Sequence, residues 1–217
     1  LSVHSLLPEQ DTLWVGFNNS SYAQVVSNHV KLYSVPSRRT EPIRRFRRLD
    51  NTLFVITKIR SQNHYHPQQQ FGLYLNDLTR YRNRWVLMSK PICMWTPEEM
   101  ALAGKSLVAP DSLLHANPLL PTTGTTALVD NTERLWIGTL IGLYLMAPGQ
   151  MHITPILPNE INSSVSHISP LNHEPLLAVA TSRNGIFILK DSQVVEQYNP
   201  SSGLPAGRCQ ALWIDEK

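Results

Sequence analysis

A short sequence recurs along the chain at intervals of about forty residues, and it limits the possible folds more than any other feature. Its clearest copy is residues 134–139 (Arg-Leu-Trp-Ile-Gly-Thr) followed by residues 142–145 (Gly-Leu-Tyr-Leu), which predicts two short strands joined by a turn. Related apolar segments begin at Leu13, Leu53 and Leu177. The four starts, at 13, 53, 135 and 177, are separated by 40, 82 and 42 residues. Such a period, with several short strands in each repeat, is typical of propeller blades.

The repeat predicts an all-β fold, a β-propeller of about four four-stranded blades and the start of a fifth. We assign the blades, within a single domain over residues 1–217, to residues 1–36, 43–89, 125–157 and 165–199, with the next blade starting at 208–217. A blade cannot bury both faces of its sheet alone. We therefore expect these blades to be part of a larger ring, or their outer faces to meet partners.

Residues 89–124 interrupt the pattern and predict an insertion with a short helix near residues 96–103. Thr96 is suited to the N-cap, Pro97 to the first helical position, and two glutamates to the first turn, where the helix dipole favours them. This insertion explains the double-length step better than a degenerate extra blade, because it contains no second copy of the repeated motif.

Composition excludes few functions. The chain has 217 residues, 42% hydrophobic and 16% charged, and its net charge of +3 does not by itself call for nucleic acid. No apolar run reaches the roughly 18 residues of a membrane span. Cys93 and Cys209 are expected to be two buried thiols, with a single disulfide as the open alternative.

Several elements in the second half of the chain resemble, in the right order, the two-component regulator propeller repeat. They are residues 127–130, 135–139 and 142–144, then Gly203-Leu204-Pro205 and residues 211–215. The first two blades depart from this pattern, since Phe17 and Ile56 replace motif residues.

The resemblance implies a non-catalytic ligand-sensing segment of a bacterial two-component-type receptor. It implies a location on the periplasmic or extracellular side of the inner membrane, a carbohydrate or other small ligand, and a parent protein of the kind that has a histidine kinase or cyclase output domain. A homodimer would form through the parent receptor, and the membrane would be reached only through a segment outside this chain. A protein-interaction platform is the alternative.

A propeller lyase or hydrolase is a further, weaker alternative. The chain contains no GxSxG, HExxH or P-loop motif, so no catalytic residue is predicted. If such an enzyme were present, His167, on an expected inner strand, would be the candidate. We expect no cofactor.

Loop lengths predict which face of the propeller binds a ligand. Strands in a blade alternate in direction, so the connections b–c (second to third strand) and d–a (fourth strand to the next blade) share one face. The long segments 58–70 and 89–124 were assigned to that face. Aromatic rings that stack on a sugar and polar groups that orient it suggest these ligand residues there: Arg60, Tyr65, Trp95, Arg183 and Asn184.

A basic cluster allows two interpretations. It comprises Arg38, Arg39, Arg44, Arg45, Arg47 and Arg48. It is either a solvated or salt-bridged surface, or a site where Arg45 and Arg47 bind an anionic ligand near the ring's channel. Nucleic acid is not expected, because basic and aromatic residues are not interleaved elsewhere.

His64 and His66 are weak candidates for a metal pair, since they lie on one side of an extended segment. No third ligand is evident, so we predict no metal site.

Overall fold

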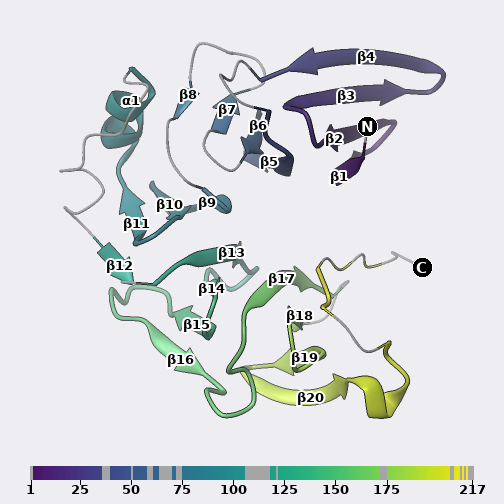
Figure 1. Cartoon of the computed structure of the whole chain (residues 1–217). Helices are drawn as coiled ribbons and strands as arrows, with labels where there is room; N and C mark the ends of the chain where they lie inside the picture. The colour runs from purple at the N-terminus through teal and green to yellow at the C-terminus, as the bar shows by residue number, and fades with distance from the viewer. Residues whose placement is uncertain are drawn as a thin grey trace. The chain divides into compact units, whose positions relative to one another are not determined.

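The computed structural model describes residues 2–35, 40–49, 51–57, 61–63, 70–71, 75–105, 118–120, 122–171, 175–205, 208–210, 212 and 214. These residues form five four-stranded sheets, and in each sheet the strands lie in the order in which they follow one another in the chain (Figure 1). We call them sheets A to E. The chain divides into two compact units, residues 1–89 with 93–118 and residues 90–92 with 119–217, which are described separately.

Sheets A and B are formed by residues 3–71. Sheet A contains β1 (Val3–Glu9), β2 (Thr12–Phe17), β3 (Ser21–Val26) and β4 (His29–Ser34). Sheet B contains β5 (Ile43–Leu49), β6 (Thr52–Thr57), β7 (Ser61–Asn63) and β8 (Gln70–Phe71).

Sheet C and a helix occupy the middle of the chain. The sheet contains β9 (Asp77–Tyr81), β10 (Arg84–Met88), β11 (Ile92–Trp95) and β12 (Pro118–Leu120). Helix α1 (Pro97–Lys105) follows β11. Its N-terminus is closed by a capping box: the Glu99 amide donates to Thr96 Oγ1 at 3.3 Å, and the Thr96 amide donates to Glu99 Oε2 at 2.7 Å. The predicted helix and its N-cap are confirmed.

Sheets D and E follow the predicted strands closely. Sheet D contains β13 (Gly124–Val129), β14 (Leu135–Thr139), β15 (Gly142–Met146) and β16 (Thr154–Ile156). Sheet E contains β17 (Val165–Pro170), β18 (Leu176–Thr181), β19 (Ile186–Lys190) and β20 (Gln193–Tyr198). The turn between β19 and β20 has positive φ at Asp191 (47°) and Ser192 (71°), the geometry of a tight two-residue hairpin turn.

The predicted division of the chain into blades is wrong in the middle. Residues 43–89 do not form one blade, because β9 and β10 pair with each other and begin sheet C. Residues 84–88, at the end of the predicted second blade, would be its outer strand, yet Val86, Leu87 and Met88 are buried, whereas the outer strand β20 is exposed throughout. A strand so apolar is stable only between other layers. The double-length step therefore contains a complete extra sheet rather than only an insertion.

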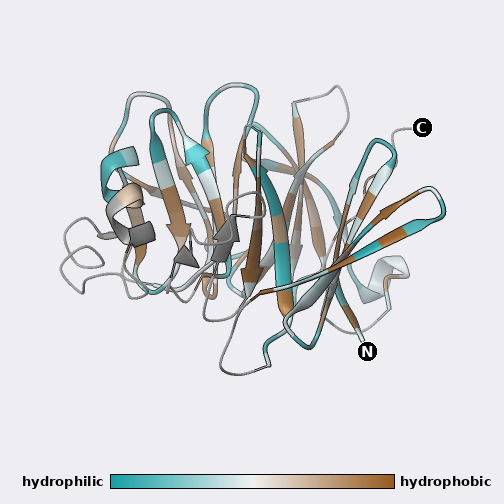
Figure 2. Ribbon diagram, turned by 90° about the horizontal axis from the view of Figure 1, so that it is seen from above, coloured by the Kyte–Doolittle hydropathy of each residue, from teal (hydrophilic) through white to brown (hydrophobic). Residues whose placement is uncertain are grey.

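Apolar residues on facing strands form the cores between neighbouring sheets, and Figure 2 shows them concentrated on the strands. In the first unit, Trp14 and Tyr22 of sheet A pack with Ile43 and Phe46 of sheet B. Phe54 and Ile56, also of sheet B, pack with residues of sheet C and Met100 of the helix. In the second unit, the core between sheets D and E includes Trp136, Leu143, Val165, Val179 and Phe187.

The recurring glycine of the motif is explained by close contact between successive sheets. A Cβ added at Gly138 would lie 2.8 Å from Cγ1 of Val165, the first residue of the next sheet. At Gly16, a Cβ would lie 2.7 Å from Cβ of Ile43, the first residue of sheet B. Any larger residue at these positions would push the next sheet away.

The recurring tryptophan is held by an acidic residue at the end of the preceding strand. The Trp136 indole N–H donates to Asp130 Oδ2 at 2.8 Å, and the Trp14 indole donates to Glu9 Oε2 at 3.0 Å. Asp130 also accepts hydrogen bonds from the backbone amides of Thr132 and Arg134, which closes the turn. The acid and the tryptophan thus have a structural role.

Candidate functional site

Five of the nine predicted ligand and metal residues lie among the described residues: Arg45, Arg47, Trp95, Arg183 and Asn184. The other four, Arg60, His64, Tyr65 and His66, lie outside the described residues, as do Arg38 and Arg39.

Arg45 and Arg47 both bind Asp77. They point to the same side of β5 because side chains two residues apart in a strand share a face. Asp77 is the first residue of β9, and its side chain is 0% exposed. Arg47 Nε donates to Asp77 Oδ1 at 2.5 Å, while Arg47 Nη2 and Arg45 Nη1 both donate to Oδ2. The anion that these arginines hold is a carboxylate of the protein itself.

The balance of burial and charge differs between the two guanidiniums. Burial lowers the pKa of both, and the Asp77 carboxylate raises it. The pKa of Arg47 ends above its ordinary value. The pKa of Arg45 ends below it, because burial outweighs the attraction of Asp77 and the positive charge of Arg47 adds a repulsion. Two cations sharing one carboxylate form a compact link between sheets B and C.

The other described members of the basic cluster also have partners within the protein. Arg44 Nη1 donates to Asn76 Oδ1 at 2.5 Å. Arg48 binds Glu9 through two hydrogen bonds, Nε to Oε1 at 2.8 Å and Nη2 to Oε2 at 2.5 Å, and this contact lowers the pKa of Glu9. Arg45, Arg47 and Arg48 therefore have the salt-bridged arrangement, one of the two interpretations of the cluster.

Trp95 does not present a ring to solvent. It is 1% exposed on β11 and belongs to the core that contains Phe54, Leu78 and Met100. The expectation that it stacks on a sugar is wrong, because the apolar contacts that fold sheet C cover it. A loop position is expected for Trp95 only if residues 89–124 are an insertion, and the structure places it on a strand of sheet C instead.

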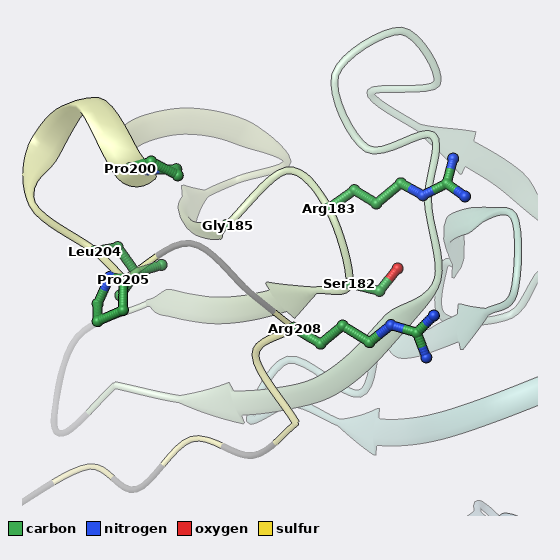
Figure 3. Close-up of a pocket in the computed structure, with 7 residues that line it drawn as sticks. All are labelled: Ser182, Arg183, Gly185, Pro200, Leu204, Pro205 and Arg208. Carbon is green, nitrogen blue, oxygen red and sulfur yellow. The ribbon is translucent and has the colours of Figure 1, made fainter.

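Arg183 lines a pocket of about 330 Å³ at one end of sheet E. The other lining residues, drawn in Figure 3, are Ser182, Gly185, Pro200, Leu204, Pro205 and Arg208. They come from the β18–β19 turn and from the segment that follows β20. Figure 3 shows Ser182, Arg183 and Arg208 extending toward the same side, with the prolines and Leu204 set apart from them.

The β18–β19 turn is fixed by side-chain hydrogen bonds. Thr181 Oγ1 accepts from the Asn184 amide and donates to the Gly185 carbonyl, both at 2.9 Å. Gly185 has φ of 84°, and a Cβ there would lie 2.0 Å from the Tyr198 carbonyl oxygen, so only glycine fits. Asn184 accepts from Ser163 Oγ at 2.6 Å through Oδ1. Asn184, a predicted ligand residue, is thus used to hold the turn.

Hydrogen bonds also hold the segment that follows β20. Asn199 caps the short 3₁₀-helix η1 (Pro200–Ser202) by accepting from the Ser201 amide at 3.0 Å, and Gly203 ends it with φ of 94°. Further along, the Cys209 carbonyl accepts from Ser166 Oγ at 2.5 Å, which anchors the residue next to Arg208. Arg183 and Arg208 therefore project from backbone that is held in place.

Within the part of the chain that the structure describes, no carboxylate forms an ion pair with Arg183 or Arg208. Both side chains are exposed. Two positive charges beside a partly apolar pocket favour a ligand that carries a negative charge.

Arg208 and Ser182 were missed at the sequence level. The motif Gly203-Leu204-Pro205, which precedes a new blade, could have identified them. The residues that follow this motif, including Arg208, lie beside the β18–β19 turn, which is the b–c turn of sheet E. The pocket lies between a b–c turn and a segment leading to the next blade, so it is on the face for which ligand binding is predicted. However, loop length does not mark that face in sheet C. The long connection that contains α1 joins β11 to β12, and it therefore lies at the same end of the sheet as the β9–β10 turn, which is the opposite face.

The described residues contain no group of three or more His, Cys, Asp or Glu side chains arranged to hold a metal ion. His167 lies on β17, partly buried, opposite Ala180 of β18. Cys93 and Cys209 form no disulfide: Cys93 is buried, as expected, and burial raises the pKa of its thiol, whereas Cys209 is partly exposed, which the prediction of two buried thiols did not give. No described helix combines the length and the apolar character needed to cross a membrane.

No protein-family model matches the chain, and no curated protein matches its sequence. Solved structures do match it. The extracellular domain of a protein named as a hybrid two-component system of B. thetaiotaomicron aligns with a TM-score of 0.66 at 13% identity, over 98% of this chain and 31% of that one. The chain has a β-propeller fold.

Two further structures support this assignment. The extracellular domain of a second B. thetaiotaomicron protein, also named as a hybrid two-component system, aligns with a TM-score of 0.60 at 14% identity, over 90% of this chain and 28% of that one. The WD40 β-propeller domain of Doa1 aligns with a TM-score of 0.60 at 10% identity, over 90% of this chain and 68% of that one. The chain thus spans about a third of the length of the two extracellular domains it matches.

Proposed function

We propose that this chain is the ligand-sensing propeller segment of a bacterial signalling receptor and that it binds a small anionic ligand, such as an acidic sugar, at Arg183 and Arg208. The fold it shares with extracellular domains of two-component proteins supports the sensor part of the proposal. The segment would lie outside the cytoplasm and would perform no chemistry itself.

The observation that carries the ligand assignment is a difference between arginines. Arg45, Arg47, Arg48 and Arg134 each bind a carboxylate of the protein. Arg183 and Arg208 have none among the described residues, yet they line one pocket. A guanidinium with no internal partner keeps its hydrogen-bond donors available for a carboxylate or sulfate group.

The remaining lining residues suit a sugar. Ser182 supplies a hydroxyl on the same side as the two guanidiniums (Figure 3). Pro200, Leu204 and Pro205 supply apolar surface, against which the C–H face of a sugar ring can pack. The pocket thus combines a few polar groups that fix orientation with apolar contacts.

A ligand held by both arginines would bridge the β18–β19 turn and the segment after β20. It would stabilise the arrangement in which Arg183 and Arg208 are close, and so shift the population of receptor states. In the parent receptor we propose that this shift acts through a homodimer and a membrane-spanning segment outside this chain on a histidine kinase or cyclase domain.

The test is calorimetric titration with galacturonate and with galactose, which lacks the carboxylate. We expect galacturonate to bind, galactose not to bind measurably, and Arg183→Ala or Arg208→Ala to weaken binding about tenfold or more, the effect of losing a hydrogen bond between charged groups. Arg84→Ala is the control, because Arg84 is an exposed arginine on β10 away from the pocket. Equal binding of both sugars, or full affinity in the two pocket variants, would overturn the anionic-ligand assignment.

A further inference from the structure

Sheet A meets sheet B, and sheet D meets sheet E, through the same contact at the start of the first strand. Ile43, which begins sheet B, packs on Gly16, and Val165, which begins sheet E, packs on Gly138. Both apolar residues are fully buried. Each fills a space that exists only because the preceding sheet has a glycine there.

A hydroxyl group accompanies each of these contacts. Ser5 Oγ donates to the carbonyl of Ile43 at 2.8 Å, and Thr125 Oγ1 donates to the carbonyl of Val165. The receiving sheet therefore offers a glycine and a hydroxyl, and the following sheet offers an apolar side chain and a carbonyl oxygen. The contact has a defined direction along the chain.

Val3 occupies the same position in sheet A as Ile43 in sheet B and Val165 in sheet E. Val3 pairs with Phe17 just as Ile43 pairs with Thr57 and Val165 with Thr181, and in all three sheets the register shifts immediately afterwards. Val3 is therefore the apolar residue that a preceding sheet should receive. It is 56% exposed.

Two neighbours of Val3 show the same contrast. Leu6 is 59% exposed, whereas its counterparts three residues after Ile43 and Val165, which are Phe46 and Ile168, are at most 4% exposed. Leu13, opposite Pro8, is 36% exposed, whereas Leu53 and Leu177, at the matching places in sheets B and E, are also at most 4% exposed. One face of β1 and β2 thus carries the complete apolar set that the other sheets bury.

Sheet E, the last sheet along the chain, already receives the corresponding contact from the segment that follows it. Ser166 Oγ, on the first strand of sheet E, donates to the Cys209 carbonyl, as Ser5 does to Ile43. Beside it on β18 lies Ala180, a small residue that is fully buried. Cys209 therefore stands where the first residue of a further sheet belongs.

We propose that the face formed by Val3, Leu6 and Leu13 is covered by a further blade of the same repeat, carried by the same polypeptide. This blade would place a glycine or alanine of its second strand against Val3, and a serine or threonine hydroxyl of its first strand would donate to the Val3 carbonyl. A second copy of the chain is a poor partner, because the receiving faces of its sheets A, D and E already hold Ile43, Val165 and Cys209.

The test is cysteine labelling in the native polypeptide that contains these residues, with Cys209→Ser to remove the partly exposed thiol. Leu6→Cys is compared with Leu32→Cys, which lies in the same row across the sheet, through Val15 and Ala23, but on the outer strand β4. Leu32 is 69% exposed, and Pro155 and Gln197, at the corresponding places in β16 and β20, are exposed too, so the proposed blade would leave it accessible.

We expect Leu6→Cys to react with a maleimide at least about tenfold more slowly than Leu32→Cys in the native polypeptide, and at a similar rate in residues 1–217 alone. Val3→Cys, a smaller change, is the second variant and should follow Leu6→Cys. Equal reactivity in the native polypeptide would overturn the proposal. So would protection already present in residues 1–217, or protection that grows with protein concentration, which would indicate a second copy.

Discussion

Two groups of arginines in this protein show how the same side chain comes to serve structure or ligand binding. Arg45 and Arg47 share the buried carboxylate of Asp77 and link sheets B and C. Arg183 and Arg208 line a pocket at the end of sheet E and have no carboxylate partner among the described residues. The difference depends on what the fold brings within reach of each side chain.

Their positions explain the contrast. Arg45 and Arg47 lie on β5, a first strand, and the next first strand, β9, begins with Asp77 beside them. Arg183 lies in a turn and Arg208 in a connection, where the nearest backbone is held by Thr181, Asn184 and Ser166 rather than by acidic groups. The two arginines on the strand between sheets B and C are neutralised by the fold, and the two beside the pocket have no carboxylate partner among the described residues.

The largest effect that would test this contrast is expected from Asp77→Asn. The substitution keeps the shape of the side chain but leaves two partly buried guanidiniums without a counter-charge. We expect the free energy of unfolding to fall by about 3 kcal/mol, near the lower limit for breaking a buried ion pair because both arginines retain some exposure to water. Urea denaturation at pH 7 measures it.

Asp11→Asn is the matched control, since Asp11 is exposed in the β1–β2 turn, and it should change stability by no more than about 0.5 kcal/mol. If Asp77→Asn were as mild as Asp11→Asn, the Arg45–Asp77–Arg47 group would not be a structural link, and the contrast with the pocket would be lost.

An intermediate effect is expected from Asp130→Asn, which tests whether acidic residues in the second unit also act structurally. Burial raises the pKa of Asp130, but hydrogen bonds from Trp136, Arg134 and Thr132 lower it by more, to about 2 from an ordinary 3.8. We expect a loss of about 1.5–3 kcal/mol at pH 7, the range for hydrogen bonds to a charged group.

The same prediction has a pH dependence. Because the folded pKa lies below that of the unfolded chain, the stabilisation by the Asp130 carboxylate is complete above about pH 4 and is lost as the pH falls toward 2. The difference in unfolding free energy between the protein and Asp130→Asn should therefore shrink over that window. A constant difference from pH 7 to pH 2 would contradict the assigned hydrogen bonds. Asp191→Asn, exposed beside Arg134, is the control.

The smallest effect on stability is expected for the pocket itself. Arg183→Ala and Arg208→Ala should each change the free energy of unfolding by no more than about 0.5 kcal/mol, because neither removes an internal ion pair among the described residues. Arg47→Ala should cost more, about 1.5 kcal/mol, since it removes two hydrogen bonds to a buried carboxylate. Equal losses in all three variants, measured by thermal and urea unfolding, would remove the distinction between the two groups.

Much of the fold could be predicted from local sequence. The strands Leu135–Thr139, Gly142–Met146 and Leu176–Thr181 lie within one residue of the repeated segments predicted at 134–139, at 142–145 and from Leu177, because an apolar strand, a threonine and a glycine-containing turn follow one another there. The start of α1 was predicted from Thr96 and Pro97. These features depend on neighbours in the chain.

The middle of the chain was misassigned because a match to the repeated motif was preferred to a run of apolar residues typical of a buried strand. Phe71-Gly72-Leu73-Tyr74 matches the motif at Gly142, yet Phe71 ends β8, the outer strand of its sheet. The run Trp85-Val86-Leu87-Met88 resembled Trp136-Ile137 more, as a buried second strand, and would have identified sheet C. Trp95 could then have been recognised as a core residue.

By itself, the sequence determined that this chain folds into repeated four-stranded sheets, since period, strand patterns and turn residues act over short distances. Only the tertiary structure decided which arginines are neutralised and which remain available, because Asp77 lies thirty residues from Arg47 in the chain and Arg208 lies far from Arg183. Such pairings depend on which strands become neighbours. The position of an ion pair between sheets follows from packing, and no local pattern encodes it.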